Sequence, residues 1–257
     1  MALTLEQVQV LIKAETGPYK KALKEIQNQT DNAQKVVNQK VGGMNETFSK
    51  IGNAIKIAAI TGALYKVGSY GTQMALEVSA AMNQIKRTMG ESSQSFLKWA
   101  DNGAIAYNIA KADALKYGAV YSNLFSNFIK DSDQLAGYTV KMLEASSVIA
   151  SATGRTMDDV MNRIRSGMLG STEAIEDLGI NVNVAMLEAT DAFQQFANGR
   201  SWAQLDFNTQ QAIRMMAILE QASKKYGTTL MQGPTTSLAY FVALLKNSAL
   251  NIGNAFL

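Results

Sequence analysis

The chain has 257 residues, 47% of them hydrophobic, and its 24 Lys and Arg against 21 Asp and Glu leave a net charge of only +3. It contains no cysteine and no histidine, which excludes disulfides, thiolate and imidazole metal ligands, and histidine acid–base chemistry. The two prolines and the many Ala, Gln, Met and Leu predict a nearly all-helical protein, and the charge is too small to indicate nucleic-acid binding.

Residues 1–17 are predicted to form a short strand or arm. Apolar residues alternate with polar ones, which is the period of a strand, at Val8, Val10, Ile12 and Ala14. A lone strand needs a partner, so we expect it to pair with another copy or another protein, or to fray. Pro18 then suits the first turn of a following helix.

Residues 18–90 carry a heptad pattern typical of a long coiled-coil-like helix. Its seam repeats in alternating steps of four and three residues at Tyr19, Leu23, Ile26, Thr30, Ala33 and Val37. Gly42 and Gly43 interrupt the pattern, which then resumes, so the region is either one rod or a helical hairpin hinged at these glycines. The seam predicts either self-association into a homo-oligomer or packing against later helices.

Residues 91–233 are predicted to form a multi-helix globular core, and residues 234–257 a long C-terminal helix that continues in the full-length protein. Helix starts are expected at Ser92 or Ser93, Asp113, Ser132, Thr156, Asn183, and Asp206 or Asn208. A single helix is expected between Asn183 and Gly199. The aromatic residues indicate core and not a base-stacking surface, because few basic residues are interleaved with them.

The stretch from residue 147 to 183 has the densest helix punctuation in the chain. Thr156 is expected to cap a helix by accepting a hydrogen bond from the amide of Asp159. A short helix is expected over residues 173–178. The glycines predicted to end helices or form turns in this stretch are Gly154, Gly167, Gly170 and Gly179.

This stretch resembles the core domain of phage tail tape measure proteins. The resemblance is carried, in order, by ATG ending at Gly154, GMLG at residues 167–170 and LGI at residues 178–180, and it extends over residues 75–255. The predicted strand, turn and long heptad helix at the N-terminus are also similar to the start of such proteins. The resemblance implies a structural protein that lies inside the tail tube and fixes tube length by its own extent.

The same resemblance implies partners and a location. The partners would be the tail tube protein, tail assembly chaperones and baseplate or tail-tip proteins. The location would be the lumen of the virion tail, and the host cytoplasm during assembly.

No membrane span is expected, because the longest uncharged apolar run, residues 57–65, is far shorter than the ~20 residues that a span needs.

No set of residues predicts catalysis, a cofactor or a metal, so the chain is not expected to be an enzyme. Asp158 with Asp159 and Glu176 with Asp177 are sequence neighbours that point to different sides of a helix. Residues 167–170 lack the Lys-Ser/Thr of a phosphate loop. The neighbouring carboxylates are therefore interpreted as helix-terminal charges.

A helical effector or hydrolase is the alternative to the structural role. Its only candidates are Ser95 with Lys98, an S-x-x-K pattern without the companion K-T-G, and Asp131 with Asp133. The latter opens like a calcium loop but lacks the required glycine and glutamate. A helix cap explains Asp131 and Asp133 better.

Overall fold

The structure, a computed structural model, describes residues 63–230 and 234–254. The predicted strand at residues 1–17, the seam from Tyr19 to Val37 and the break at Gly42 and Gly43 lie outside the described residues. Every regular element within them is an α-helix or a 3₁₀-helix, so the all-α prediction is confirmed for this part of the chain.

The helices follow one another with short connections along most of the described chain. In order they are α3 (Ala63–Met89), η1 (Gly90–Ser92), α4 (Ser93–Asn102), η2 (Ala104–Tyr107), α5 (Lys111–Phe125), α6 (Ser132–Thr153), α7 (Met157–Met168), α8 (Thr172–Glu176), α9 (Val184–Glu188), α10 (Asp191–Phe196), η3 (Trp202–Gln204), α11 (Phe207–Tyr226) and α12 (Pro234–Asn254).

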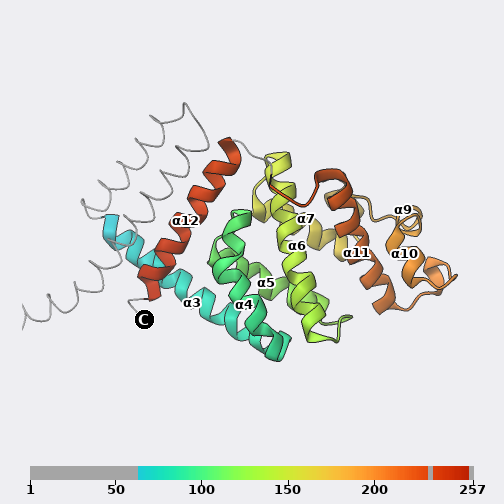
Figure 1. Cartoon of the computed structure of the whole chain (residues 1–257), viewed down its shortest axis with the longest axis horizontal. Helices are drawn as coiled ribbons and strands as arrows, with labels where there is room; N and C mark the ends of the chain where they lie inside the picture. Colours follow the sequence, from blue (N-terminus) through green and yellow to red (C-terminus); the bar gives the residue numbers. More distant parts are fainter. Residues whose placement is uncertain (1–62, 231–233, 255–257) are drawn as a thin grey trace, which may run out of the picture.

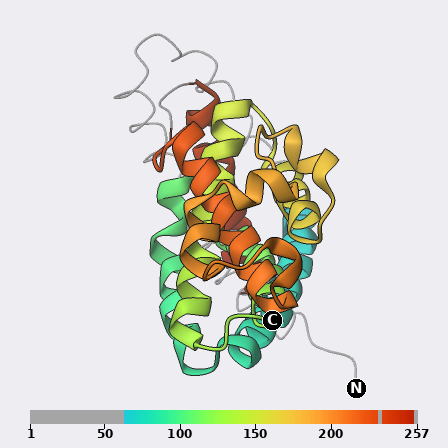
Figure 2. The same ribbon diagram turned by 90° about the vertical axis from the view of Figure 1, so that its right-hand side faces the viewer.

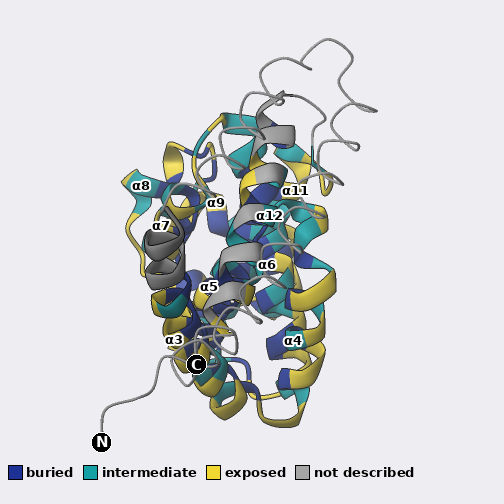
Figure 3. Ribbon diagram, turned by 90° about the vertical axis from the view of Figure 1, so that its left-hand side faces the viewer, coloured by how far each residue is buried: buried dark blue, intermediate teal, exposed yellow. Residues whose placement is uncertain are grey.

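Helices α3 to α6 and α12 form a bundle at one end of the molecule, and α7 to α11 continue from it (Figure 1). Helix α12 returns across the molecule to pack on α3. Buried apolar side chains form one continuous cluster from Met74 in α3 to Leu250 in α12. Buried residues gather in the middle of the molecule around α5 and α6, and exposed residues lie on the outer turns (Figure 3).

Large apolar side chains recur at helical spacing along the helices of the bundle, so they lie on one face of each helix and pack into the core. Phe96, Tyr121 and Phe125 are among the largest fully buried residues. The rings of Tyr121 and Phe125 meet edge-on with centroids 5.4 Å apart, a geometry that aromatic pairs favour. The Tyr121 hydroxyl also donates to the Met161 carbonyl at 2.8 Å, so this buried polar group is satisfied.

Of the predicted helix starts in the bundle, Ser132 is the first residue of α6, with the cap one residue earlier, and Asp113 was wrong. Helix α6 is capped by Asp131, which accepts from the Gln134 amide at 2.7 Å, and Ser132 is already helical. Helix α5 begins at Lys111, two residues before the predicted Asp113. The amide of Lys111 donates to Asn247 Oδ1 at 2.7 Å, so a side chain from the distant α12 takes the place of a local cap.

The predicted single helix between Asn183 and Gly199 is two short helices, α9 and α10. Thr190 separates them, because its backbone is extended and its hydroxyl accepts from the Phe193 amide at 3.2 Å. The Glu220 carboxylate of α11 accepts from the amides of Asp191 at 3.4 Å and Ala192 at 3.3 Å. Local and distant acceptors together therefore start a new helix at α10.

Figure 2 views the molecule from the end formed by α9, α10 and α11, and shows α11 lying beside the short helices. The predicted caps at Asn183 and Asp206 are confirmed: Asn183 accepts from the Met186 amide at 2.9 Å and Asp206 from the Thr209 amide at 3.0 Å. Within residues 63–230 and 234–254, none of the helices has the length and apolar character needed to cross a bilayer.

Candidate functional site

Three of the four predicted turn glycines have a left-handed backbone at a helix end. Gly154 follows α6 with φ 71°, Gly170 lies just after α7 with φ 95°, and Gly179 lies beyond α8 with φ 63°. Glycine adopts this conformation without the steric cost that a Cβ brings. The fourth, Gly167, lies inside α7, one residue before its last helical residue.

Gly167 permits α7 and α8 to approach closely. A Cβ at Gly167 would lie 2.5 Å from Cδ1 of Ile175 and 3.0 Å from its Cβ, and Ile175 is fully buried in α8. Real side chains do not tolerate such a contact without movement of a neighbour. The first glycine of GMLG therefore serves helix packing, and the second serves the turn.

Helix α7 begins with the predicted local cap. The Asp159 amide donates to Thr156 Oγ1 at 3.2 Å, and Thr156 has the extended backbone typical of a cap residue. The cap prediction is therefore confirmed.

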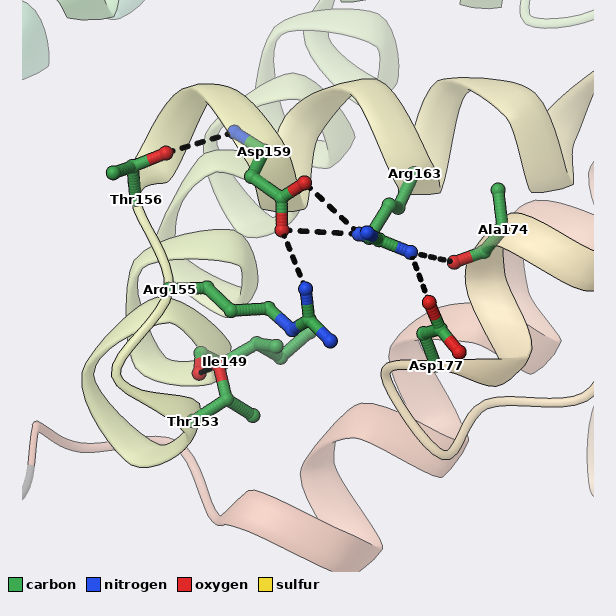
Figure 4. Close-up of polar contacts among 8 residues, drawn as sticks. All are labelled: Ile149, Thr153, Arg155, Thr156, Asp159, Arg163, Ala174 and Asp177. Atoms are coloured by element: carbon green, nitrogen blue, oxygen red, sulfur yellow. Dashed lines mark hydrogen bonds and ion pairs between the residues drawn. The ribbon is translucent and has the colours of Figure 1, made fainter.

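A guanidinium joins α7 to α8 (Figure 4). Arg163 Nε donates to both carboxylate oxygens of Asp159 at 3.0 Å, and Arg163 Nη1 donates to Asp177 Oδ2 at 2.6 Å and to the Ala174 carbonyl at 3.1 Å. Arg155 Nη1 also donates to Asp159 at 3.0 Å. Two of the carboxylates interpreted as helix-terminal charges thus share one arginine.

We call Arg163 with its two carboxylate partners, Asp159 and Asp177, the Arg163 clamp. Its hydrogen bonds favour the ionised forms of Asp159 and Arg163. Hydrogen bonding from Arg163, and then from Arg155, lowers the pKa of Asp159, and the Asp159 carboxylate in turn raises the pKa of Arg163. The ion pair contributes stability above the unfolded-state pKa of Asp159 and loses it as pH falls through the lowered folded-state pKa.

The end of α7 is held by α11. Arg214 Nη1 donates to the Met168 carbonyl at 3.5 Å, and the Gln211 amide, oriented with its oxygen toward Arg214 Nη1 at 3.0 Å, donates to the same carbonyl at 2.8 Å. Met168 is the last residue of α7, where carbonyls have no helical donor. Arg214 also lies over the ring of Trp202, 5.4 Å from its centroid, and burial lowers the Arg214 pKa.

The turn after α8 is held by the other half of α11. The Tyr226 hydroxyl donates to the Leu178 carbonyl at 2.6 Å. Gln221 binds both main-chain groups of Asn181: its Nε2 donates to the carbonyl at 2.8 Å, and its Oε1 accepts from the amide at 2.9 Å. We call the four side chains that reach these turns the turn-binding face of α11; they are Gln211, Arg214, Gln221 and Tyr226.

Sequence reasoning missed the turn-binding face, although a signal for it exists. Gln211, Arg214 and Gln221 fall in line with the fully buried Ile218 at helical steps of three and four. Polar residues on a helix face that is otherwise buried need partners. That pattern predicts hydrogen bonds to neighbouring main chain, but it does not say to which turn.

Three of the four residues of the alternative enzyme hypothesis lie at helix starts, and the fourth, Lys98, lies in the middle of α4. Ser95 Oγ donates to the Ser92 carbonyl at 2.7 Å, Asp131 caps α6, and Asp133 accepts from Ser92 Oγ. Among the residues that the structure describes, no three acidic side chains gather where they could hold a metal ion.

In the turn region, side chains of α7 and α11 form hydrogen bonds to main-chain groups, and these bonds fix the relative positions of α7, α8 and α11.

Comparisons with models of protein families, with curated proteins and with solved structures found no match for this chain.

Proposed function

We propose that this chain is a structural protein of a phage tail, a tape measure that lies in the tube lumen and sets tube length. The observation that carries the proposal is the ordered series ATG, GMLG and LGI in a helical chain, which resembles the tape measure core. Its support from the geometry is that Gly154, Gly170 and Gly179 all take left-handed turn conformations and that one helix, α11, bonds to the last two turns.

The physical basis of such a role is the fixed rise of the α-helix. Each helical residue adds about 1.5 Å, so a helical chain converts residue number into length. In this proposal the heptad-patterned residues before α3 supply rod-like length, and α3 to α12 supply a folded module, because α3 and α12 pack on each other and on α5. The protein is not an enzyme and needs no cofactor.

The proposed partners follow from that location. They are the tail tube protein around the chain, the assembly chaperones that coat it before the tube forms, and baseplate or tail-tip proteins at one end. Several copies would associate through the seam of residues 19–37 into a homo-oligomer. The site of action is the virion tail, reached from the host cytoplasm.

In-frame changes of chain length test the proposal. Residues 19–46, four heptads, are deleted in one phage and duplicated in another. Both changes keep the heptad phase of the residues that follow, and the duplication also keeps the predicted seam, which the deletion removes. If the block is helical, the tail shortens by roughly 42 Å in the first and lengthens by the same amount in the second, at about 1.5 Å per residue. Electron microscopy of purified particles measures the lengths. Normal tails in both phages would contradict the role.

A further inference from the structure

A cleft of about 460 Å³ lies where α5, α6, α7 and α12 meet. This volume lies within the range of small-molecule and side-chain sites. The apolar side chains that line it include Ile109, Ala150, Met157, Ala239 and Val242. Ala239 and Val242 are exposed, so the cleft opens along α12 to the surface of the molecule.

Both cations that line the cleft already have acidic partners. Arg155 Nη1 pairs with Asp159 at 3.0 Å, and Lys246 Nζ pairs with Asp113 at 2.7 Å. An anionic ligand would have to compete with these carboxylates for each cation. The lining therefore disfavours phosphate or a carboxylate as the ligand.

One negative charge in the cleft has no such partner. Asp158, in the first turn of α7, lines the cleft and makes no ion pair or hydrogen bond through its carboxylate with any residue that the structure describes. A second cleft of about 280 Å³ meets the first at Asp113, Asp158 and Lys246. It adds Glu77 and Lys116, whose formal charges cancel, so the lining of the second cleft has a net formal charge of −1, while Arg155, paired with Asp159, makes the lining of the first cleft neutral.

We propose that this cleft binds an alkylammonium group, the chemistry shared by a lysine side chain and a free aliphatic amine. The ammonium lies at the Asp158 carboxylate, and the methylene stem lies along Met157, Ala239 and Val242. A strongly hydrated cation on an apolar stem matches a carboxylate beside an aliphatic wall. This site is independent of the tail role proposed above.

Titration of the full chain with small probes tests the site. The probes are pentylamine, the lysine side chain as Nα-acetyl-lysine methylamide, and inorganic phosphate, and binding is followed by calorimetry and by amide shifts in NMR spectra. The site predicts saturable binding of the amines with Kd on the order of 1 mM or tighter, weakened by added salt, and no binding of phosphate. Tighter binding of the lysine derivative would assign the site to a polypeptide partner, and tighter or equal binding of pentylamine to free amines.

Asp158→Asn is expected to weaken amine binding about tenfold, because it removes the charge that accepts from the ammonium. Glu173→Gln is the matched control, since Glu173 is also an exposed carboxylate in the first turn of a helix, and it leaves the affinity unchanged. Ala239→Leu keeps all charges and narrows the cleft where the methylene stem would lie, so it is also expected to weaken amine binding, while circular dichroism stays as in the parent. Phosphate binding, no amine binding, or equal affinity in Asp158→Asn would overturn the proposal.

Discussion

The bundle of α3 to α6 and α12 and the region of α7 to α11 share one apolar core, but they differ in how much side-chain hydrogen bonding positions their helices. The bundle consists mostly of long helices around fully buried rings such as Phe96 and Phe125. In the second region α8, α9 and α10 have only five or six residues each, far below the length at which a helix is stable alone. Buried side chains such as Ile175 and Leu187 join them to the common apolar core, and caps, the hydrogen bonds of Arg163 and the turn-binding face of α11 fix their ends.

The largest expected effect lies in the bundle. Phe125→Ala removes a fully buried ring that packs on Tyr121 and Phe128, and is expected to cost about 3–5 kcal/mol of the free energy of unfolding. Phe207→Ala is the control, because Phe207 is 65% exposed and its loss is expected to change stability by no more than about 0.5 kcal/mol. Urea denaturation measures the free energy of unfolding of both variants. A similar loss of stability in the two would show that burial of the Phe125 ring does not stabilise the bundle.

A smaller effect is expected where α7 meets α8. Gly167→Ala is expected to cost about 1–3 kcal/mol, because the added methyl would overlap Ile175. The matched control is Gly137→Ala in α6, where a Cβ has open space and alanine is expected to stabilise the helix by about 0.5–1 kcal/mol. Thermal melts of the two variants should therefore shift in opposite directions, and a shift of both in one direction would refute the packing role of Gly167.

A pH-dependent effect is expected at the edge of the bundle. Burial raises the pKa of Glu144, against hydrogen bonds from Trp99, whose Nε1 donates to it at 3.0 Å, and from Tyr107. Because the folded-state pKa is the higher one, this group's stabilisation is complete below its unfolded-state pKa and is lost as pH rises through its folded-state pKa.

Glu144→Gln removes that titration and keeps an acceptor for Trp99. The difference in melting temperature, variant minus parent, is expected to increase as pH rises from about 4 to 7. Asp159 and Asp206, whose pKa values are lowered, titrate equally in both proteins and cancel in the difference. A difference that stays constant with pH would show that Glu144 is not linked to folding.

Local signals in the sequence predicted part of this fold. Thr156, Asn183 and Asp206 were recognisable as caps because each accepts from an amide only three residues ahead. The start of α5 was not, because its acceptor, Asn247, is 136 residues away. The break at Thr190 was missed although it carries the local signal, since Thr190 accepts from the Phe193 amide three residues ahead; the additional bonds from Glu220 of α11 come from a distant residue.

In the candidate site, too, contacts between residues far apart in the sequence could not be predicted. Gly154, Gly170 and Gly179 could be predicted as turns, because left-handed backbone favours glycine at any helix end. The role of Gly167 depends on the proximity of Ile175, and the bonds from Gln221 to Asn181 join residues 40 positions apart. The spacing of residues in the sequence does not say which distant helix will pack against a given turn.

The central structural claim is that α11 side chains hold the turns of the second region. Amide hydrogen exchange at Asn181 tests it most directly, because the Asn181 amide donates to Gln221 Oε1. In Gln221→Ala we predict that this amide exchanges at least about fivefold faster, while amides of α5 in the bundle keep their rates. An unchanged rate at Asn181 would contradict the claim.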